Sequence, residues 1–237
     1  MPRFRNLKHQ STFLSNYTVA CPMPVRKIPK NYLFVTGGFS SRKNSRMAGF
    51  ESPLEKDYML LLEFDNSVAS FEEQPLTIPV PGIHKGYTQD LLVKFNPQQI
   101  TGHQRPPALV EVKHSEELAK NKNKYAKKFE HARNFTRERG WEFEIVTEKE
   151  IRVPRLRNLK FLREYRNITP SPDERDQILN VMNMLGNTAS IQDLLEKLCP
   201  DQERRLTSLP VIWHMVIAGF LIVDLDLAVS NASIVWT

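Results

Sequence analysis

Apolar and polar residues alternate through residues 108–117, ALVEVKHSEE, and this alternation predicts a β-strand. One face would carry Ala108, Val110 and Val112, and the other Leu109, Glu111 and Lys113. The first face is a core face. The second places a carboxylate beside an amine in an apolar element. Either the strand lies at a sheet edge with that face in water, or the pair sits in a cleft and takes part in chemistry.

Helix and strand periodicities follow one another through the first two thirds of the chain, which indicates an α/β layer domain. The predicted elements are a strand at 31–38 that ends in a glycine turn, a basic loop at 39–47, a helix at 52–65, strands at 68–75, 87–95 and 106–114, a helix at 115–139 and a strand at 141–148. The second helix begins at Ser115 and ends at Gly140, since glycine favours the left-handed conformation that closes a helix.

The helix at 52–65 has a readable start. Ser52 is the expected N-cap, Pro53 is the first helical residue, and Glu55 is the third, which completes a capping box. The residues expected on its buried stripe are Leu54, Tyr58, Leu61 and Leu62.

The last third of the chain has a different organisation. Residues 168–174 contain two prolines and a change in charge sign, so they form a predicted linker. Beyond it lie three helical patterns, at about 174–186, 190–198 and 202–218, followed by two apolar strands, GFLIVDLD and ASIVWT. Three helices and a terminal hairpin predict a winged-helix domain at 174–237. At the other end, residues 1–30 form a proline-rich basic arm.

The composition is that of a globular protein, with 41% hydrophobic and 25% charged residues among 237. No apolar run approaches the roughly 20 residues of a membrane span, and the start has no apolar segment typical of a signal peptide. Cys21 and Cys199 are far apart and indicate neither a zinc site nor a disulfide scaffold. We expect a cytoplasmic protein without a membrane partner.

The net charge of +6 is unevenly distributed. Residues 1–50 contain nine Lys and Arg and no acid, whereas residues from 170 onward contain nine acids and four bases. A further basic segment spans 151–169. Unopposed cations suit phosphate contacts, so the first two thirds favour nucleic acid and the acidic end favours a protein partner. A merely solvated face is the alternative.

Three side chains have the chemistry of a metal-dependent phosphodiesterase. Asp90 lies on the strand before the one that carries Glu111 and Lys113. Two carboxylates on adjacent strands can share Mg²⁺, which polarises a phosphate and lowers the pKa of a bound water. A neighbouring lysine could orient the nucleophile or stabilise the developing charge. The alternatives are a surface position for Asp90 and a structural salt bridge between the other two.

The ordered set ESPLEKDYMLLLEFD, SFEEQP, YTQDLLV, LVEVK and GWEFEIVTEKEI resembles the TnsA endonuclease subunit of heteromeric cut-and-paste transposases. This resemblance, over about 30–237, implies a restriction-endonuclease-like mixed sheet of the PD-(D/E)xK type flanked by helices at 31–167, with the winged helix behind it. Gln89 stands where such proteins usually have a proline before the aspartate.

The resemblance also implies roles. Asp90 and Glu111 would be metal ligands, Lys113 the catalytic amine, and Glu55 a further catalytic carboxylate that reaches the metal. As a capping residue Glu55 would need no such role. Glu63 and Glu73 are the rival acids, the first expected to be exposed and the second structural. The candidate DNA-binding residues are Arg42, Lys43, Arg46, His84, Lys85, Arg152, Arg155 and Arg157, the last three in a proline-stiffened basic loop.

The leading hypothesis is therefore a Mg²⁺-dependent endonuclease, with Mn²⁺ able to substitute, that cuts the 5′, non-transferred strands at the transposon ends of DNA. A DDE-type transposase subunit would cut and join the other strand, and an AAA+ regulator would be a further partner. The expected setting is the bacterial cytoplasm, at the nucleoid during transposition. The alternatives are a stand-alone restriction or repair nuclease and a non-catalytic DNA-binding scaffold on a nuclease core.

Overall fold

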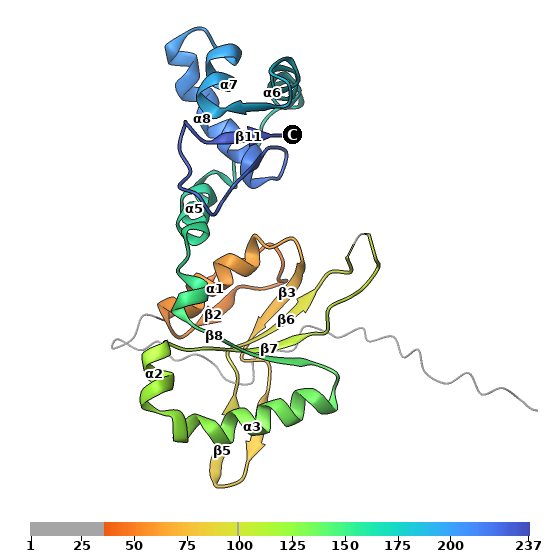
Figure 1. The fold of residues 1–237 in the computed structure, drawn as a ribbon, viewed down its shortest axis with the longest axis vertical. Coiled ribbons are helices and arrows are strands. Elements are labelled where there is room, and N and C mark those ends of the chain that lie inside the picture. Colours follow the sequence, from red (N-terminus) through yellow and green to blue (C-terminus); the bar gives the residue numbers. More distant parts are fainter. Residues whose placement is uncertain (1–35, 99) are drawn as a thin grey trace, which may run out of the picture.

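The structure is a computed structural model that describes residues 36–98 and 100–237. Its centre is a four-stranded mixed sheet in the order β3-β6-β7-β8 (Figure 1). The strands are β3 (Val68–Glu73), β6 (Leu91–Phe95), β7 (Ala108–Val112) and β8 (Glu142–Val146). Neighbours are antiparallel except β7 and β8, which are parallel. The α/β class and the mixed sheet predicted from the sequence are confirmed.

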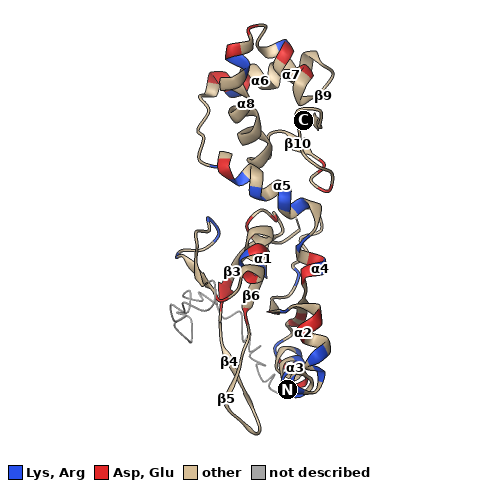
Figure 2. Cartoon of the chain, turned by 90° about the vertical axis from the view of Figure 1, so that its left-hand side faces the viewer, with Lys and Arg blue, Asp and Glu red and all other residues tan. Residues whose placement is uncertain are grey.

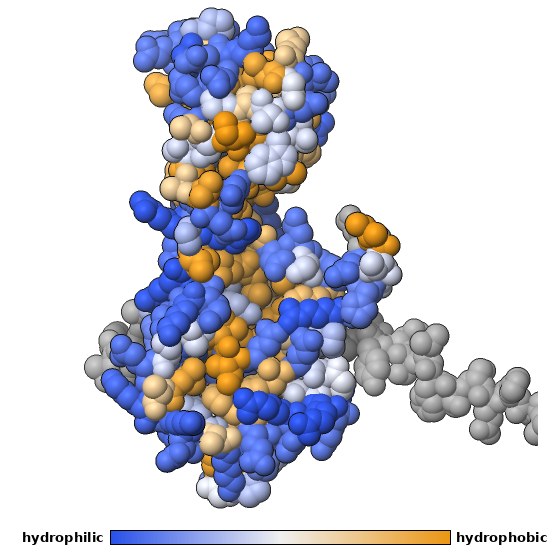
Figure 3. Space-filling model, viewed as in Figure 1, coloured by the Kyte–Doolittle hydropathy of each residue, from blue (hydrophilic) through white to orange (hydrophobic). Residues whose placement is uncertain are grey.

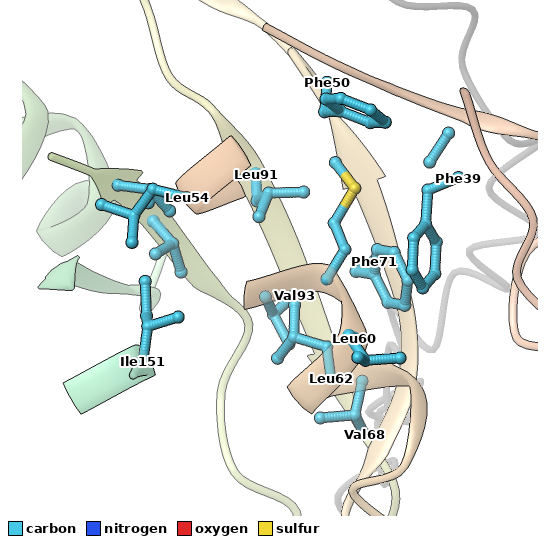
Figure 4. Close-up of a cluster of buried hydrophobic side chains, with 14 of the residues drawn as sticks. Phe39, Phe50, Leu54, Leu60, Leu62, Val68, Phe71, Leu91, Val93 and Ile151 are labelled. Carbon is cyan, nitrogen blue, oxygen red and sulfur yellow. The ribbon is translucent and has the colours of Figure 1, made fainter. Parts of the chain in front are cut away.

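Helices cover both faces of this sheet. α1 (Pro53–Glu63) packs on one face, where Ala108, Val110 and Val112 join its core. Figure 4 shows the α1 side chains Leu54, Leu60 and Leu62 among those of β3 and β6. On the other face, Leu109 meets the buried residues of α3 (Lys122–Glu138). All five residues of β7 are buried, because the strand is interior and has a helix on each side.

Helix α1 begins as predicted, with Ser52 as N-cap and Pro53 in its first turn. Its buried stripe differs from the prediction. Leu54 and Leu62 are buried together with Met59 and Leu60, whereas Tyr58 and Leu61 are only partly covered. The helix meets β2 and β3 as well as β7 and the following helices, so more of its circumference is covered than a single stripe.

The predicted strand at 31–38 is only partly within the described residues, and its end was wrong. Gly37 and Gly38 do not form a turn but belong to β1 (Gly37–Phe39), which pairs with β2 (Ala48–Phe50). A Cβ on Gly38 would lie 2.1 Å from Met47 Sδ. The glycine therefore lets the Met47 side chain cross the strand, which is a packing role and not a turn role.

The predicted strand at 87–95 is two strands that meet at Asp90. The first, β5 (Ile83–Thr88), pairs with β4 (Thr77–Val80) in a hairpin that stands beside α3 (Figure 1). Its turn contains Pro81 and Gly82, and Gly82 has φ +80, as expected at the third position of a type II turn. The chain then enters the central sheet as β6.

The predicted helix at 115–139 is broken at Asn121. It consists of α2 (Ser115–Lys120) and α3, and α3 ends before Gly140 (φ +66) as expected. The Asn121 side chain donates to the carbonyl of Glu117 (3.2 Å), and such local bonds compete with a continuous helix. Ser115 is the first residue of α2, and His114 holds the cap position.

The basic segment after β8 is helical and not a loop. It forms α4 (Glu148–Ile151) and α5 (Pro154–Leu162), followed by the short helix η1 (Arg163–Tyr165). Proline suits the first turn of a helix, and Leu156, Leu159 and Leu162 are buried at helical spacing. The prediction of a proline-stiffened loop was therefore wrong.

The C-terminal unit contains the three predicted helices, α6 (Pro172–Met184), α7 (Ile191–Leu198) and α8 (Gln202–Ile217). Its antiparallel sheet has the order β10-β11-β9, from Ile222–Val223, Ile234–Trp236 and Thr188–Ser190. β9 was not predicted. The unit has its own core around Ile212 and Trp213. Within residues 36–98 and 100–237, no helix has the length and apolar character needed to cross a membrane.

Asn158 joins α5 to the C-terminal unit. Its Nδ2 donates to the carbonyls of Leu225 (2.7 Å) and Leu227 (2.6 Å), and its Oδ1 accepts from the amide of Val229 (3.2 Å). The side chain is buried, so these three bonds replace the water it gives up. They anchor the loop between β10 and β11 to α5.

Candidate active site

Asp90, Glu111 and Lys113 meet where β6 and β7 lie side by side. Asp90 Oδ2 accepts from the Val112 amide (2.8 Å) and from Lys113 Nζ (3.1 Å), and Lys113 Nζ lies 2.8 Å from Glu111 Oε1. The pairing of Leu91 with Val110 brings the Asp90 end of β6 to the Glu111 end of β7. An ammonium group thus lies between two carboxylates from adjacent strands, as the alternation in ALVEVK predicted.

Glu111 is the most deeply buried of the three, at 2% exposure. Burial, and then the nearby Asp90 charge, raise the pKa of Glu111 to about 7, against the opposing effect of Lys113. Its second oxygen, Oε2, is buried, and the Tyr87 hydroxyl acts on this carboxylate as a donor, although no hydrogen bond of good geometry joins the two groups. A buried carboxylate oxygen without a well-placed donor is costly, so this atom is suited to bind a cation or a donor from outside the chain.

Lys113 stays charged at neutral pH. Burial lowers the pKa of Lys113, but the carboxylates of Asp90 and Glu111 more than offset burial, and the net direction is upward. The amine therefore acts as a fixed positive charge in the cleft and not as a base.

Glu55 caps the start of α1, and its carboxylate is also influenced by the charge of Asp90. Its Oε1 accepts from Ser52 Oγ (2.9 Å), and its Oε2 accepts from the amide of Glu51 (2.9 Å), so the capping function is real but is directed one residue earlier than expected. Burial and then the charge of Asp90 raise the pKa of Glu55 to about 7. The carboxylate is thus within electrostatic reach of Asp90.

The three meeting side chains open into a cleft of about 460 Å³ between the β4–β5 hairpin, the central sheet and α3. Further lining residues include Glu51, Gln74, Lys85, Tyr87, Tyr125 and Lys128. Glu55 does not line this cleft directly, whereas its hydrogen-bond partner Glu51 does. The sequence analysis gave no site role to Tyr87 or Lys128. Tyr87 lies on β5, whose hairpin was not predicted, and Lys128 lies on α3, whose lysine-rich face could equally be exposed to solvent.

Tyr87 faces Glu111 across the cleft floor. Burial first, and then the charge of Glu111, raise the pKa of Tyr87, so the phenol stays protonated. Its hydroxyl oxygen has no partner of hydrogen-bond geometry within the described part of the chain. Lys128 lies over the ring, with Nζ 5.4 Å from its centroid.

The two rival acids lie outside this cleft. Glu63 accepts from Ser41 Oγ (2.6 Å) and from the Arg42 amide (2.8 Å), so it is buried, and the prediction of an exposed residue was wrong. The loop after β1 folds over the end of α1 and covers it. Glu73 is buried and forms an ion pair with Arg46. Gln89 is fully buried and donates to the Tyr87 carbonyl (3.0 Å).

The candidate DNA-binding residues of the loop at 39–47 hold the loop to its surroundings. Arg42 donates to the carbonyl of Arg166 (2.8 Å), Lys43 donates to that of Leu62 (2.8 Å), and Arg46 pairs with Glu73. Lys43 thereby supplies a positive charge at the C-terminal end of α1, where a helix favours one. Burial lowers the pKa of Lys43.

The other candidates lie on the hairpin and on the helices after β8. His84 and Lys85 are exposed on β5, and Lys85 lines the cleft. Arg152 lies 3.8 Å from Asp57, and Arg155 pairs with Asp226 at 3.0 Å. Arg157 is exposed on α5. Figure 2 shows Lys and Arg residues along α5 and α3, and Asp and Glu residues on α2 and α4, the helices next to α3 along the chain.

The surface around these residues is largely hydrophilic. Figure 3 shows hydrophilic residues over most of the viewed face, with hydrophobic residues between them. The most exposed of the large apolar side chains in the described residues is Ile100, at 98% exposure in the loop before β7.

Two family models match the chain, one described as TnsA-like endonuclease N terminal at residues 65–148 and the other as TnsA endonuclease C terminal at residues 150–225. The chain belongs to the TnsA endonuclease family. Asp90, Glu111 and Lys113 lie within the first match, and Glu55 precedes it. This TnsA-type chain is thus an endonuclease of the kind that serves as a subunit of a transposase, acting on DNA beside a partner subunit. No curated protein matches the chain.

Proposed function

We propose that this TnsA-type protein hydrolyses the 5′, non-transferred strands at transposon ends, and that it needs a divalent metal ion to do so. The observation that carries the proposal is the meeting of Asp90, Glu111 and Lys113 in one cleft, with an oxygen of Glu111 that is buried without a hydrogen bond of good geometry among the described residues. Two acids and a cation at a shared hollow suit a phosphodiester, because its hydrolysis builds negative charge that needs stabilisation.

The donor set fits Mg²⁺, with Mn²⁺ as a substitute. No group of three His, Cys, Asp or Glu side chains in the described ranges is arranged as a ready metal cage. Mg²⁺ does not require one, since it is commonly held by one or two carboxylates with waters and substrate phosphates. Asp90 and Glu111 would hold the ion, and the Glu55 carboxylate would add negative charge near the site without lining the cleft. When bound, the ion would polarise the phosphate and acidify a water.

Lys113 has a defined part in the reaction. Because its amine stays protonated, it stabilises the negative charge that grows on the phosphate oxygens as the water oxygen bonds to phosphorus. The bond from phosphorus to the leaving sugar oxygen breaks, and one proton of the water ends on that oxygen. The other stays with the new phosphate monoester until the monoester ionises.

DNA would reach the cleft along its basic rim. Lys85 on β5 and Lys128 on α3 both line the cleft, so they are placed to bind phosphates next to the reacting one. His84, Lys85 and Arg157 make no hydrogen bond or ion pair within the described residues. Arg42, Lys43, Arg46, Arg152 and Arg155 would have to share or exchange their present partners to bind DNA.

The domain plan belongs to the same proposal. We assign residues 31–167 to the nuclease and 174–237 to a winged helix, because the order of α6, β9, α7, α8, β10 and β11 suits that fold. The acidic balance of the second unit suits a protein partner. The partners would be a DDE-type transposase, which cuts and joins the other strand, and an AAA+ regulator, at the bacterial nucleoid.

The test uses purified protein, Mg²⁺ and plasmid DNA that carries transposon ends, with and without the transposase subunit. Primer extension maps each cut. We expect cuts on the 5′ strands that require both Mg²⁺ and the partner, and that disappear in Asp90→Ala and Lys113→Ala. Cleavage without the partner would indicate a stand-alone nuclease, and full transposition by both variants would indicate a scaffold.

The chain offers a matched control for these variants. Glu72 on β3 is also a buried carboxylate, pairs with Lys94 at 2.7 Å, and lies on the same sheet without lining the cleft. Glu72→Gln should cut DNA at the wild-type rate. A comparable loss in this variant would mean that any damage to buried ion pairs of the sheet abolishes activity, and the proposed site would lose its support.

A further inference from the structure

Gln74, at the end of β3, has an unusual backbone conformation for its residue type. Its φ is +44, in the left-handed region where glycine is the ordinary choice, and it stands directly before Pro75. Its amide donates to the carbonyl of Asp90 (2.9 Å), so this conformation brings the Gln74 backbone against the catalytic strand. A glycine could make the same bond with less strain.

The backbone conformation alone would favour glycine at position 74, so the reason for a glutamine there must lie in its side chain. It is 5% exposed, and its Oε1 is buried without a hydrogen-bond partner in the described chain. Gln74 nevertheless lines the cleft that holds Asp90, Glu111 and Lys113. A strained backbone and an unsatisfied acceptor both cost stability, and such costs gather at functional sites.

The chemistry of the cleft decides what this acceptor can bind. A phosphate group brings only acceptors at neutral pH, and the cations Lys85, Lys113 and Lys128 can satisfy them. A carbonyl oxygen needs a donor instead. Water is the component of phosphodiester hydrolysis that brings donors. The unpaired Oε1 of Gln74 is an uncharged acceptor on the cleft wall, and unlike the Tyr87 hydroxyl it can only accept.

We propose that Gln74 is a positioning residue that holds the attacking water through its side-chain carbonyl. The hydrogen bond fixes the water oxygen toward phosphorus, and Gln74 takes no proton itself. The Gln74 amide group, on the same side chain, is free to donate to a phosphate oxygen. This inference rests on the proposed hydrolysis of DNA and adds to it a residue outside the Asp90, Glu111 and Lys113 set.

Two substitutions separate a positioning role from a structural one. Gln74→Gly removes the side chain and relaxes the backbone, so its melting temperature should equal or exceed that of the wild type. Gln74→Met keeps the length and removes both polar atoms. In single-turnover cleavage with Mg²⁺ and transposon-end DNA, we expect both to lower kcat by about 10- to 100-fold with KM for DNA within about twofold.

Asn187 provides the matched control, since it is the other described non-glycine residue with positive φ (+64) and lies in the C-terminal unit. Asn187→Gly should leave kcat unchanged. Wild-type kcat in Gln74→Gly, or a rise in KM with unchanged kcat, would overturn the inference, as would a Gln74→Gly protein that melts earlier in proportion to its lost activity. Asp90→Ala, assayed in parallel, keeps the two proposals apart, because its full activity would instead refute the nuclease site.

Discussion

The sheet domain and the C-terminal unit bury different kinds of side chain. The ten buried polar residues of the described chain run from Glu55 to Asn158, all before the C-terminal unit. The core of that unit consists of apolar residues such as Met182, Ile212 and Trp213. Burial of polar groups lowers stability unless they are paired. Gln74 and Glu111 line the cleft, whereas buried carboxylates such as Glu72 and Glu73 form ion pairs elsewhere in the sheet domain. The described core of the C-terminal unit is therefore built from apolar packing alone, without buried polar side chains.

The residues that cap the helices also differ between the C-terminal unit and the sheet domain. Helices α6, α7 and α8 are each capped by the side chain of the preceding Ser171, Ser190 or Asp201. In the sheet domain, the cap of α1 includes Glu55, whose carboxylate is also buried near Asp90. The same carboxylate therefore takes part in the helix cap and lies within electrostatic reach of Asp90. We expect substitutions in the two regions to separate stability from activity.

The largest effect is expected from Trp213→Ala in the C-terminal core. Trp213 is 2% exposed, and truncation of a buried aromatic costs about 3–5 kcal/mol of unfolding free energy. Denaturant unfolding measures the loss. Leu227→Ala, at a site 66% exposed, is the control and should change stability by less than about 0.5 kcal/mol. Equal losses would contradict the apolar core as the source of stability in this unit.

Lys113→Met should have the next largest effect, and this effect should fall mainly on the rate of strand cleavage and less on stability. It removes the charge between Asp90 and Glu111, so we expect strand cleavage to fall about 10²- to 10³-fold, as for loss of one electrostatic group in an active site. Lys94→Met, in the Glu72 pair of the same sheet, should cleave normally. Equal rates in the two variants would mean that the cleft is not the reaction site.

Glu55→Gln should stabilise the protein in the presence of a chelator while it lowers cleavage. The folded pKa of about 7 exceeds the ordinary 4.5, so the folded state holds its proton longer and wild-type stability falls as pH rises from about 4.5 to 7. The Glu55→Gln variant has no carboxyl group to ionise at this position, so its stability does not fall in this way as pH rises. At pH 8 the gain should be on the order of 1 kcal/mol by thermal unfolding, and it should shrink toward pH 5. A variant less stable at pH 8 would show that capping outweighs charge burial.

The smallest effect is expected from Arg155→Ala. Its ion pair with Asp226 joins side chains that are 46% and 63% exposed, so a double-mutant cycle should give less than about 1 kcal/mol. If Arg155 also binds a DNA phosphate, the salt dependence of DNA binding should fall by a slope of about 1. An unchanged slope would assign Arg155 to the structural pair alone.

The sequence predicted that Asp90, Glu111 and Lys113 lie close together, but it predicted the surroundings of these residues poorly, for physical reasons. Alternation is local, so ALVEVK placed Glu111 and Lys113 on one face, and chain order placed Asp90 next to them. The β4–β5 hairpin was missed although Pro81 and Gly82 mark its turn, because its strands are short and its partner surface is α3. The pattern of apolar residues along the chain does not show that a short hairpin packs against a distant helix.

Other features could not be predicted because they depend on contacts between distant residues. Arg155 was expected to bind DNA, but its ion pair with Asp226 joins residues 71 positions apart. The left-handed Gln74 has no sequence signal, since glutamine rarely adopts that conformation and only the fold reveals its unpaired oxygen. Local rules therefore located the acids, and the fold revealed what lies around them.

The Asn158 bonds have a mechanical consequence. Since one side chain ties three backbone groups of the loop between β10 and β11 to α5, this loop cannot move away from α5 without the loss of all three bonds. Helix α5 also places Leu156 and Leu159 in the core of the sheet domain and packs on α1, the helix that carries Glu55. The loop, α5 and α1 therefore form one continuous set of contacts between the C-terminal unit and the sheet domain.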